Sequence, residues 1–149
     1  MRAVVQRVAQ ARVVIDCECV GDIEKGIMLL VGFAADDNEA AINYIIDKTI
    51  NLRIFEDANE KMNLSLVDVG GGLLVVPNFT LYGDTRKGRR PGYSLGAPPA
   101  IAEEIYNRFV STLKSKYTNV ETGIFQAHMH VELINDGPVT LLLDSDRVF

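Results

Sequence analysis

The sequence has no tryptophan, only two cysteines and no long hydrophobic run. The cysteines, Cys17 and Cys19, are too few and too close together for the disulfide framework of a small secreted protein, and they indicate reduced thiols. No segment approaches the ~18 apolar residues that a membrane span needs, and the amino-terminal residues lack the apolar core of a signal peptide. We therefore expect a cytoplasmic protein that does not enter a membrane.

Positive charge is also scarce. The chain has 15 Lys and Arg against 20 Asp and Glu, a formal net charge of −5, which argues against a protein that coats DNA. A basic spot on an acidic body indicates one localised anionic partner, although a solvated loop is the plainer interpretation. Such a spot is present, and it consists of Arg86, Lys87, Arg89 and Arg90. Without these four positive charges, the rest of the chain has a formal net charge of −9.

The length and composition are those of one globular domain. A chain of 149 residues, 48% of them hydrophobic, is long enough to bury a core without disulfides. No repeat, low-complexity segment or linker divides it, so we predict a single domain over residues 1–149. Short runs rich in Val and Ile predict an opening antiparallel meander, in which Cys17 and Cys19 lie on one face of a strand.

Two amphipathic helices are predicted. The first begins after Asp36 and Asp37 and carries a stripe of isoleucines, and the second begins after Pro98-Pro99. Apolar runs elsewhere predict further strands, at 64–69, 73–76, 120–125, 129–133 and 139–143. The elements together predict an α+β domain of mainly antiparallel sheets.

Glycine and proline mark three places in the second half of the chain. Three glycines at 70–72 predict a flexible turn before the wholly apolar strand 73–76, which should be buried on both faces. Pro77 cannot donate to a ladder, so the residues after it should leave regular pairing and expose backbone N–H groups. The tetrapeptide Asn135-Asp-Gly-Pro predicts a hairpin turn between two strands.

Candidate metal ligands and nucleophiles are few. His128, His130 and Glu132 alternate along a predicted strand and share one face, which is compatible with a metal site but is also the default on a solvent face. We expect no metal and no cofactor. There is no Gly-x-Ser-x-Gly elbow, P-loop or dinucleotide fingerprint. Thr80 is an open candidate for a nucleophile, with a histidine and Asp136 as partners, although a strand residue is the plainer interpretation.

Six stretches occur in fixed order over essentially the whole chain. They are Met1-Arg-Ala-Val-Val-Gln-Arg-Val, Leu52-Arg-Ile-Phe-Glu-Asp, Lys61-Met-Asn-Leu-Ser-Leu, Phe79-Thr-Leu-Tyr, Asp84-Thr-Arg-Lys-Gly-Arg-Arg-Pro and Asn135-Asp-Gly-Pro-Val-Thr. In this order they resemble the D-aminoacyl-tRNA deacylase family, whose members are homodimeric hydrolases that release D-amino acids from tRNA. The resemblance implies a barrel-like, β-rich fold, a tRNA substrate, a homodimer and no cofactor.

The resemblance also implies a site at the subunit interface. Backbone N–H groups of one subunit would hold the ester carbonyl while the 2′-hydroxyl of the terminal adenosine assists, and this catalytic segment is Asn78, Phe79 and Thr80. The partner subunit would contribute a Gly-Pro pair with a cis bond, whose carbonyls leave no room for an L side chain, so that D-aminoacyl and glycyl groups pass, including glycyl-tRNA(Ala). The residues of this second segment are Asn135, Asp136, Gly137 and Pro138. Arg86, Lys87, Arg89 and Arg90 would contact tRNA.

The sequence departs from the family pattern beside the expected site. Pro77-Asn78 replaces Ser-Gln, which removes a hydroxyl and a backbone donor and shortens the amide side chain by one methylene. Gln126 and His128 stand where Gly and Asp are usual. Two alternatives to the deacylase therefore stay open, a non-catalytic RNA-binding module that uses the basic residues and a hydrolase of small esters with Thr80 as nucleophile.

Overall fold

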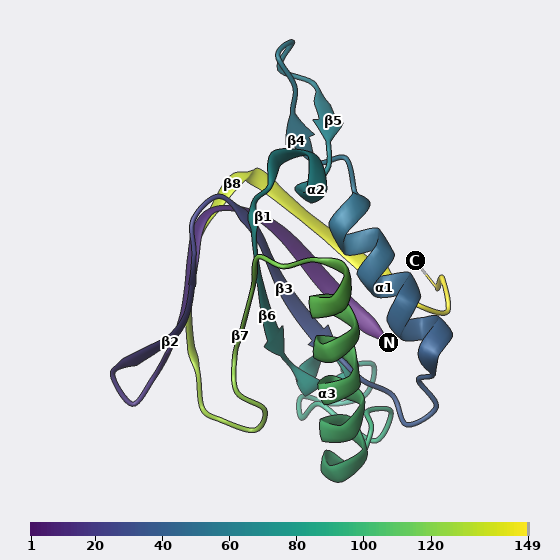
Figure 1. The fold of residues 1–149 in the computed structure, drawn as a ribbon. Coiled ribbons are helices and arrows are strands. Elements are labelled where there is room, and N and C mark those ends of the chain that lie inside the picture. The colour runs from purple at the N-terminus through teal and green to yellow at the C-terminus, as the bar shows by residue number, and fades with distance from the viewer. Residues whose placement is uncertain (149) are drawn as a thin grey trace.

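The computed structural model describes residues 1–148, which form a curled sheet with two long helices on one face (Figure 1). The strands are β1 (Arg2–Ile15), β2 (Glu18–Ile23), β3 (Gly26–Gly32), β4 (Phe55–Glu56), β5 (Met62–Leu64), β6 (Gly72–Pro77), β7 (Val120–Thr122) and β8 (His130–Asp144). The helices are α1 (Glu39–Asn51), α2 (Leu66–Val69), α3 (Pro99–Lys116) and the 3₁₀ helix η1 (Phe79–Tyr82). Within residues 1–148 no helix is both long enough and apolar enough to cross a membrane.

The main sheet is built around β1. This strand pairs in antiparallel fashion with β2, β3 and β8, whereas β6 pairs in parallel with β3 and β7. The chain passes through α1 and α2 between β3 and β6, and through η1 and α3 between β6 and β7. Crossovers of this kind return the strand in the same direction, which explains both parallel pairs. The predicted α+β class with mainly antiparallel pairing is confirmed, and the sheet is mixed where β6 joins it.

The sheet curls until its two ends approach each other. A Cβ placed on Gly21 of β2 would lie 3.1 Å from the side chain of Leu74 in β6 and 3.3 Å from the carbonyl oxygen of Thr122 in β7. This near-closure gives the expected barrel-like shape. It also creates two apolar layers, one between the sheet and the helices and one inside the curl.

Strand β6 contributes to both layers. Leu73 and Val75 pack in the layer under α1 and α3, while Leu74 and Val76 pack inside the curl. The prediction that this strand is central and buried on both faces is therefore confirmed. The two amphipathic helices are confirmed as well, because α1 buries its isoleucine stripe and α3 begins at Pro99 and buries Ile105, Phe109 and Leu113.

The prediction of a strand over 64–69 is wrong in its second half. Residues Leu66–Val69 form the single-turn helix α2, which starts from a capping box in which Ser65 and Asp68 exchange side-chain and backbone hydrogen bonds. Nor do all three glycines lie in the predicted turn, because Gly70 ends α2 and Gly72 already begins β6. A Cβ on Gly26 would lie 1.9 Å from the carbonyl oxygen of Gly72, so β3 and β6 approach too closely there for any side chain.

The predicted hairpin at Asn135–Pro138 is also wrong, because β8 continues through it. Residues on both sides of the tetrapeptide pair with the same strand, Ile134 with Gln10 and Thr140 with Gln6. The register shifts on both sides of Val8, so the extra residues of β8 form a bulge rather than a reversal of the chain. Cys17 differs from its prediction too, since it lies in the turn between β1 and β2 with a φ of 67°.

Candidate active site

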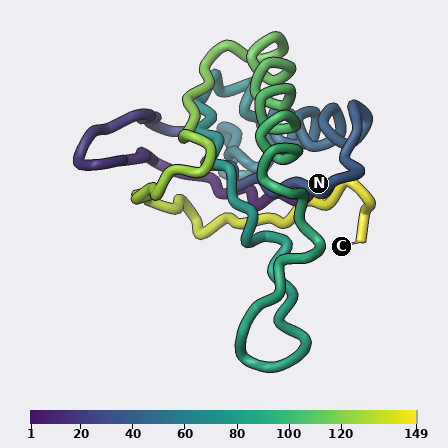
Figure 2. Tube along the Cα trace, turned by 90° about the horizontal axis from the view of Figure 1, so that it is seen from below, coloured from purple at the N-terminus to yellow at the C-terminus, as the bar shows by residue number. Residues whose placement is uncertain are grey.

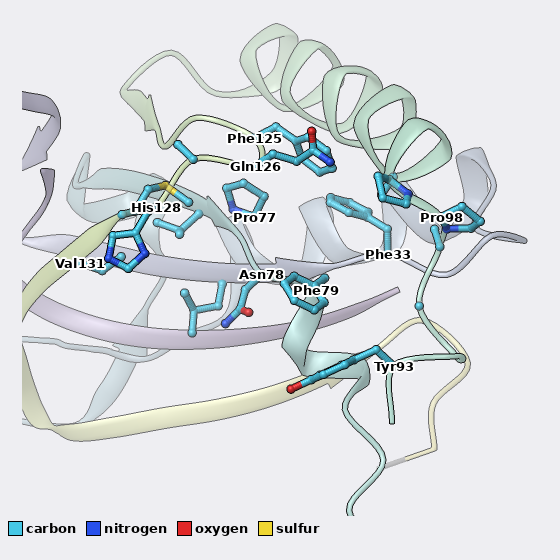
Figure 3. Close-up of a pocket in the computed structure, with 18 of the residues that line it drawn as sticks. Phe33, Pro77, Asn78, Phe79, Tyr93, Pro98, Phe125, Gln126, His128 and Val131 are labelled. Carbon is cyan, nitrogen blue, oxygen red and sulfur yellow. The ribbon is translucent and has the colours of Figure 1, made fainter. Parts of the chain in front are cut away.

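A large cavity opens beside the end of β6. It has a volume of about 1020 Å³ and is bounded by η1, the residues before α3 and the segment 125–131. Its walls are mainly apolar and include four aromatic side chains, those of Phe33, Phe79, Tyr93 and Phe125. Figure 3 shows Gln126 and His128 on the side of the cavity opposite Tyr93. Among the described residues that line it, none is Asp, Glu, Lys or Arg, so the cavity suits an uncharged, partly aromatic group.

The backbone turns away from the sheet at the floor of this cavity, as the proline predicts. The N–H of Asn78 still donates to the carbonyl oxygen of Val31, at 2.7 Å, but the next four residues form η1. The side chain of Asn78 caps η1 and accepts a hydrogen bond from the N–H of Thr80, at 3.1 Å. Within residues 1–148 the N–H of Phe79 has no such partner, and it is the backbone donor left open at this turn.

Thr80 lacks the neighbours of a nucleophile. Its hydroxyl donates to the amide oxygen of Asn78, at 2.5 Å, and a neutral amide cannot take up the proton. Within one chain Asp136 does not lie beside it, because that residue belongs to the bulge in β8. The geometry of one chain therefore offers no support to a triad built on Thr80, and the side chain serves with Asn78 to fix η1.

The bulge at Asn135–Pro138 is held by a buried arginine. Arg7 of β1, only 4% exposed, donates from Nε to the carbonyl oxygen of Asp136 at 2.9 Å and from Nη1 to that of Ile54 at 2.6 Å. The carboxylates of Asp136 and Glu56 lie 3.5 and 3.8 Å from the same guanidinium group. Arg7 thus ties the bulge of β8 to the segment that leads into β4.

Asn135 closes the bulge from within. Its amide oxygen accepts from the N–H of Val139 at 2.7 Å, and its amide nitrogen donates to the carbonyl oxygen of Val139 at 3.2 Å. Val139 is itself buried in the layer under the helices. The Gly137-Pro138 peptide bond is cis, as the resemblance implies. Asn135 and Arg7 together present Gly137 and Pro138 in one fixed position on the outer strand.

Within one chain the two predicted halves of the site are far apart. Pro77, at the end of β6, pairs with Val31 of β3, and Val31 in turn pairs with Ala3 of β1. Pro77 and Ala3 therefore lie at the same level along the sheet. Gly137 lies between the residues that pair with Gln6 and Val8. The two levels differ by about four residues, or roughly 14 Å at ~3.4 Å per residue, and three strand spacings separate β6 from β8. One copy of the chain therefore does not bring Phe79 and Gly137 together.

The four predicted cations lie on a loop next to the cavity, and one of them is already paired. Asp84 and Gly92 form an isolated antiparallel bridge that closes the loop at its base. The side chain of Arg86 donates to both carboxylate oxygens of Asp84, each at 2.8 Å, and these hydrogen bonds hold the pKa of Asp84 well below its usual value. The side chains of Lys87, Arg89 and Arg90 are exposed.

The histidines stand at the other rim. His128 lines the cavity just before β8 begins, and its ring contacts that of His130 edge to face, with centroids 5.3 Å apart. Glu132, the third member of the predicted alternation, instead pairs with Arg12 on β1 at 2.7 Å. In residues 1–148 no group of three or more His, Cys, Asp or Glu side chains is placed to hold a metal ion. Gln126 has a φ of 62°, the conformation that glycine adopts most readily, which accounts for glycine being usual there.

Sequence reasoning missed Arg7 and the aromatic walls of the cavity. The signal for Arg7 was its position, because it continues the inward alternation of Ala3 and Val5 on β1. A charged residue on the buried face of a strand needs fixed partners, and this one has them. Tyr93 and Phe125 carried no comparable signal, since they come from loops whose course depends on the fold.

Comparison with known proteins finds relatives that match nearly the whole chain. The model of the D-Tyr-tRNA(Tyr) deacylase family matches residues 4–144. D-aminoacyl-tRNA deacylases of Thermosipho africanus (strain TCF52B) and Clostridioides difficile (strain 630) are each 58% identical over 149 residues, with all of both chains covered. The solved structure of a c-Myc DNA unwinding element binding protein aligns with a TM-score of 0.92 and 37% identity, covering 97% of this chain and 98% of that one.

A more distant structure supports the fold alone. It is described as a probable eukaryotic D-amino acid tRNA deacylase and aligns with a TM-score of 0.82 at 18% identity, covering 95% of this chain and 97% of that one. The match to the family model and the identity to the two bacterial relatives both extend over nearly the whole sequence. The chain therefore belongs to the D-aminoacyl-tRNA deacylase family of hydrolases.

Proposed function

We propose that this protein hydrolyses the ester bond of D-aminoacyl-tRNA and releases a free D-amino acid and tRNA. Water adds to the ester carbonyl carbon, the bond from that carbon to the ribose 3′-oxygen breaks, and the 3′-oxygen takes up a proton. Membership of the family supports this reaction. The observation that carries it is the large uncharged cavity with an open backbone N–H at its floor, because such a site suits the terminal adenosine and its ester.

The chemistry relies on the main chain of η1 and on the substrate. In this proposal the N–H of Phe79, which has no partner within residues 1–148, donates to the carbonyl oxygen as negative charge develops on it. The 2′-hydroxyl of the terminal adenosine assists the attack, which is consistent with a cavity that has no Asp or Glu among its described lining residues and with a Thr80 hydroxyl that donates to an amide oxygen rather than to a base. A single donor of this kind contributes about 10²- to 10³-fold to the rate constant.

Selection against L-aminoacyl groups requires the second segment of the site, Gly137 and Pro138. Because this segment lies roughly 14 Å along the sheet from Phe79 in the same chain, it would reach the cavity from a second copy, in a homodimer with two equivalent sites. Arg7 and Asn135 hold it rigidly enough to act as a steric filter. Glycine has no side chain to exclude, so glycyl-tRNA(Ala) is a second substrate.

The proposal is tested by following ester loss from one tRNA charged with D-tyrosine and, in parallel, with L-tyrosine. We expect rapid hydrolysis of the D ester and, for the L ester, no loss beyond that in buffer. Equal hydrolysis of both esters, or none of either, contradicts the proposal. A glycyl-tRNA(Ala) arm tests the filter, because hydrolysis of the D ester without hydrolysis of the glycyl ester would mean that a side chain is required rather than excluded.

A second candidate is a nucleic-acid-binding protein without catalysis, because one similar structure is described as a DNA-element binding protein and this chain has an exposed basic loop. Binding of uncharged tRNA with no ester loss in the same assay would favour it. Hydrolysis of simple amino acid esters that depends on Thr80 would instead favour a small-ester hydrolase.

A further inference from the structure

We propose that the loop from Asp84 to Gly92, here called the basic finger, contacts the phosphate backbone of the RNA substrate with three of its four cations, while Arg86 braces the finger. This inference rests on the proposed function. Arg86 then has a different role from the other three cations, although all four are adjacent in the sequence. The RNA would lie on the side of the cavity where the basic finger stands.

The brace is visible in the contacts at the base of the finger. Asp84 pairs with Gly92 through two backbone hydrogen bonds, of 2.7 and 2.9 Å, and its carboxylate accepts from both the backbone N–H and the guanidinium group of Arg86. A bidentate Arg–carboxylate pair fixes both side chains in one plane. The guanidinium group of Arg86 is therefore already paired with Asp84, and this pair sets the direction in which the rest of the finger projects from the domain.

The other three cations have no such partner. Of the ion pairs formed within residues 1–148, none includes Lys87, Arg89 or Arg90. Every residue from 85 to 95 is exposed, and in Figure 2 this part of the chain, drawn in green, extends well away from the body. Three unpaired cations on a projecting loop suit an extended polyanion better than a small ligand, because they form no pocket of their own.

The finger stands beside the cavity. Its base continues directly into Tyr93, which lines the cavity and packs edge to face against Phe79 with ring centroids 5.1 Å apart. An aminoacylated 3′ end in the cavity would therefore leave the rest of the RNA close to the finger. Apart from the four cations on this loop, the chain carries a formal charge of −9, so most of its surface repels RNA.

The experiment compares two substrates at two salt concentrations. The first is D-tyrosyl-tRNA and the second is the D-tyrosyl ester of adenosine, which contains the reacting group but no phosphate. The quantity measured is the kcat/KM for D-tyrosyl-tRNA divided by the kcat/KM for the adenosine ester, at 50 mM and again at 200 mM salt. Effects of salt on the chemical step cancel in this ratio. The variant replaces Lys87, Arg89 and Arg90 by Gln. The control makes the same charge change on α3, at Arg108, Lys114 and Lys116.

Three phosphate contacts, at ~0.7 to ~0.9 each, correspond to a change in salt slope of about 2.1 to 2.7. Raising the salt fourfold should therefore lower the wild-type ratio roughly 20- to 40-fold more than that of the finger variant. The α3 control should follow the wild type. An equal decline in wild type and finger variant overturns the proposal, as does the same effect from the α3 control.

The brace is tested by the pair Asp84→Asn with Arg86→Gln, which leaves the net charge of the finger unchanged. This double variant should keep the wild-type salt slope while its KM for D-tyrosyl-tRNA rises, since the finger has lost its fixed direction. A reduced salt slope would mean that Arg86 itself contacts phosphate, contrary to the proposal. If the wild-type protein hydrolyses neither substrate, the proposed function fails, whereas an active wild type with a salt-insensitive ratio refutes only the role of the finger.

Discussion

Replacement of Arg7 by Met removes the group that holds the Gly137-Pro138 bulge. The methionine side chain fills a similar volume but cannot donate to the carbonyl oxygens of Ile54 and Asp136. A buried acceptor left without a partner costs about 1–3 kcal/mol, so two of them cost up to roughly 2–6 kcal/mol of the free energy of unfolding, the smaller share coming from Asp136, whose hydrogen bond is only partly buried. The carboxylates of Asp136 and Glu56 are half-exposed and add little.

Arg12 provides a matched control on the same strand. It pairs with Glu132 of β8 at 2.7 Å, but both side chains are 54% exposed and screened by solvent, so Arg12→Met should lower the free energy of unfolding far less than Arg7→Met. Urea denaturation at one fixed protein concentration measures both effects, because dissociation of the proposed homodimer would make the transition depend on concentration. The Arg7→Met variant should also hydrolyse L-tyrosyl-tRNA faster, since Gly137 and Pro138 are no longer held. Equal stability losses for the two variants would refute the reasoning.

Three further substitutions test separate parts of the structure. Thr80→Ala should keep most of the deacylase activity, because the hydroxyl only donates to the Asn78 side chain that caps η1; complete loss in a folded protein would restore Thr80 as a nucleophile. Gly26→Ala should prevent stable folding, measured by circular dichroism, because its Cβ would lie 1.9 Å from the carbonyl oxygen of Gly72. Hydrogen bonds from Ser65 lower the pKa of Asp68 in the folded protein. The ionised carboxylate therefore stabilises the fold at pH values above the unfolded-state pKa of ~3.9, and this stabilisation is lost as the pH falls through the pKa of the folded state. Asp68→Asn should thus destabilise the fold at neutral pH, and the difference in unfolding free energy between wild type and variant should shrink as the pH falls below ~3.9.

The fold was predictable where local pattern and tertiary structure agree. The isoleucine stripe of α1 and the apolar run of β6 each dictate burial on particular faces, and both lie where periodicity predicts them. Helix α2 was also predictable from the sequence, because Ser65 and Asp68 have the spacing of a capping box. The apolar residues around them nevertheless favoured the prediction of a strand.

The remaining features depend on partners that are distant in sequence. Asn135-Asp-Gly-Pro has the composition of a hairpin turn, and only pairing of both flanking segments with β1 makes it a bulge. The cavity likewise forms where η1, the residues before α3 and the segment 125–131 meet. The open N–H of Phe79 was predictable in part, because Pro77 predicts that regular strand pairing ends there. That this N–H in particular is unpaired follows from the Asn78 side chain, which accepts from the N–H of Thr80 instead.

The central claim is that hydrolysis at this site depends on a backbone donor rather than on a side chain. Phe79→Pro removes the N–H, and the fold should tolerate it because Phe79 is the first residue of η1, where proline is accepted. Phe79→Ala removes the same aromatic ring but keeps the N–H, so the comparison isolates the donor. For D-tyrosyl-tRNA we predict a kcat about 10²- to 10³-fold lower for the proline variant than for the alanine variant. Equal kcat values for the two folded variants would contradict the claim.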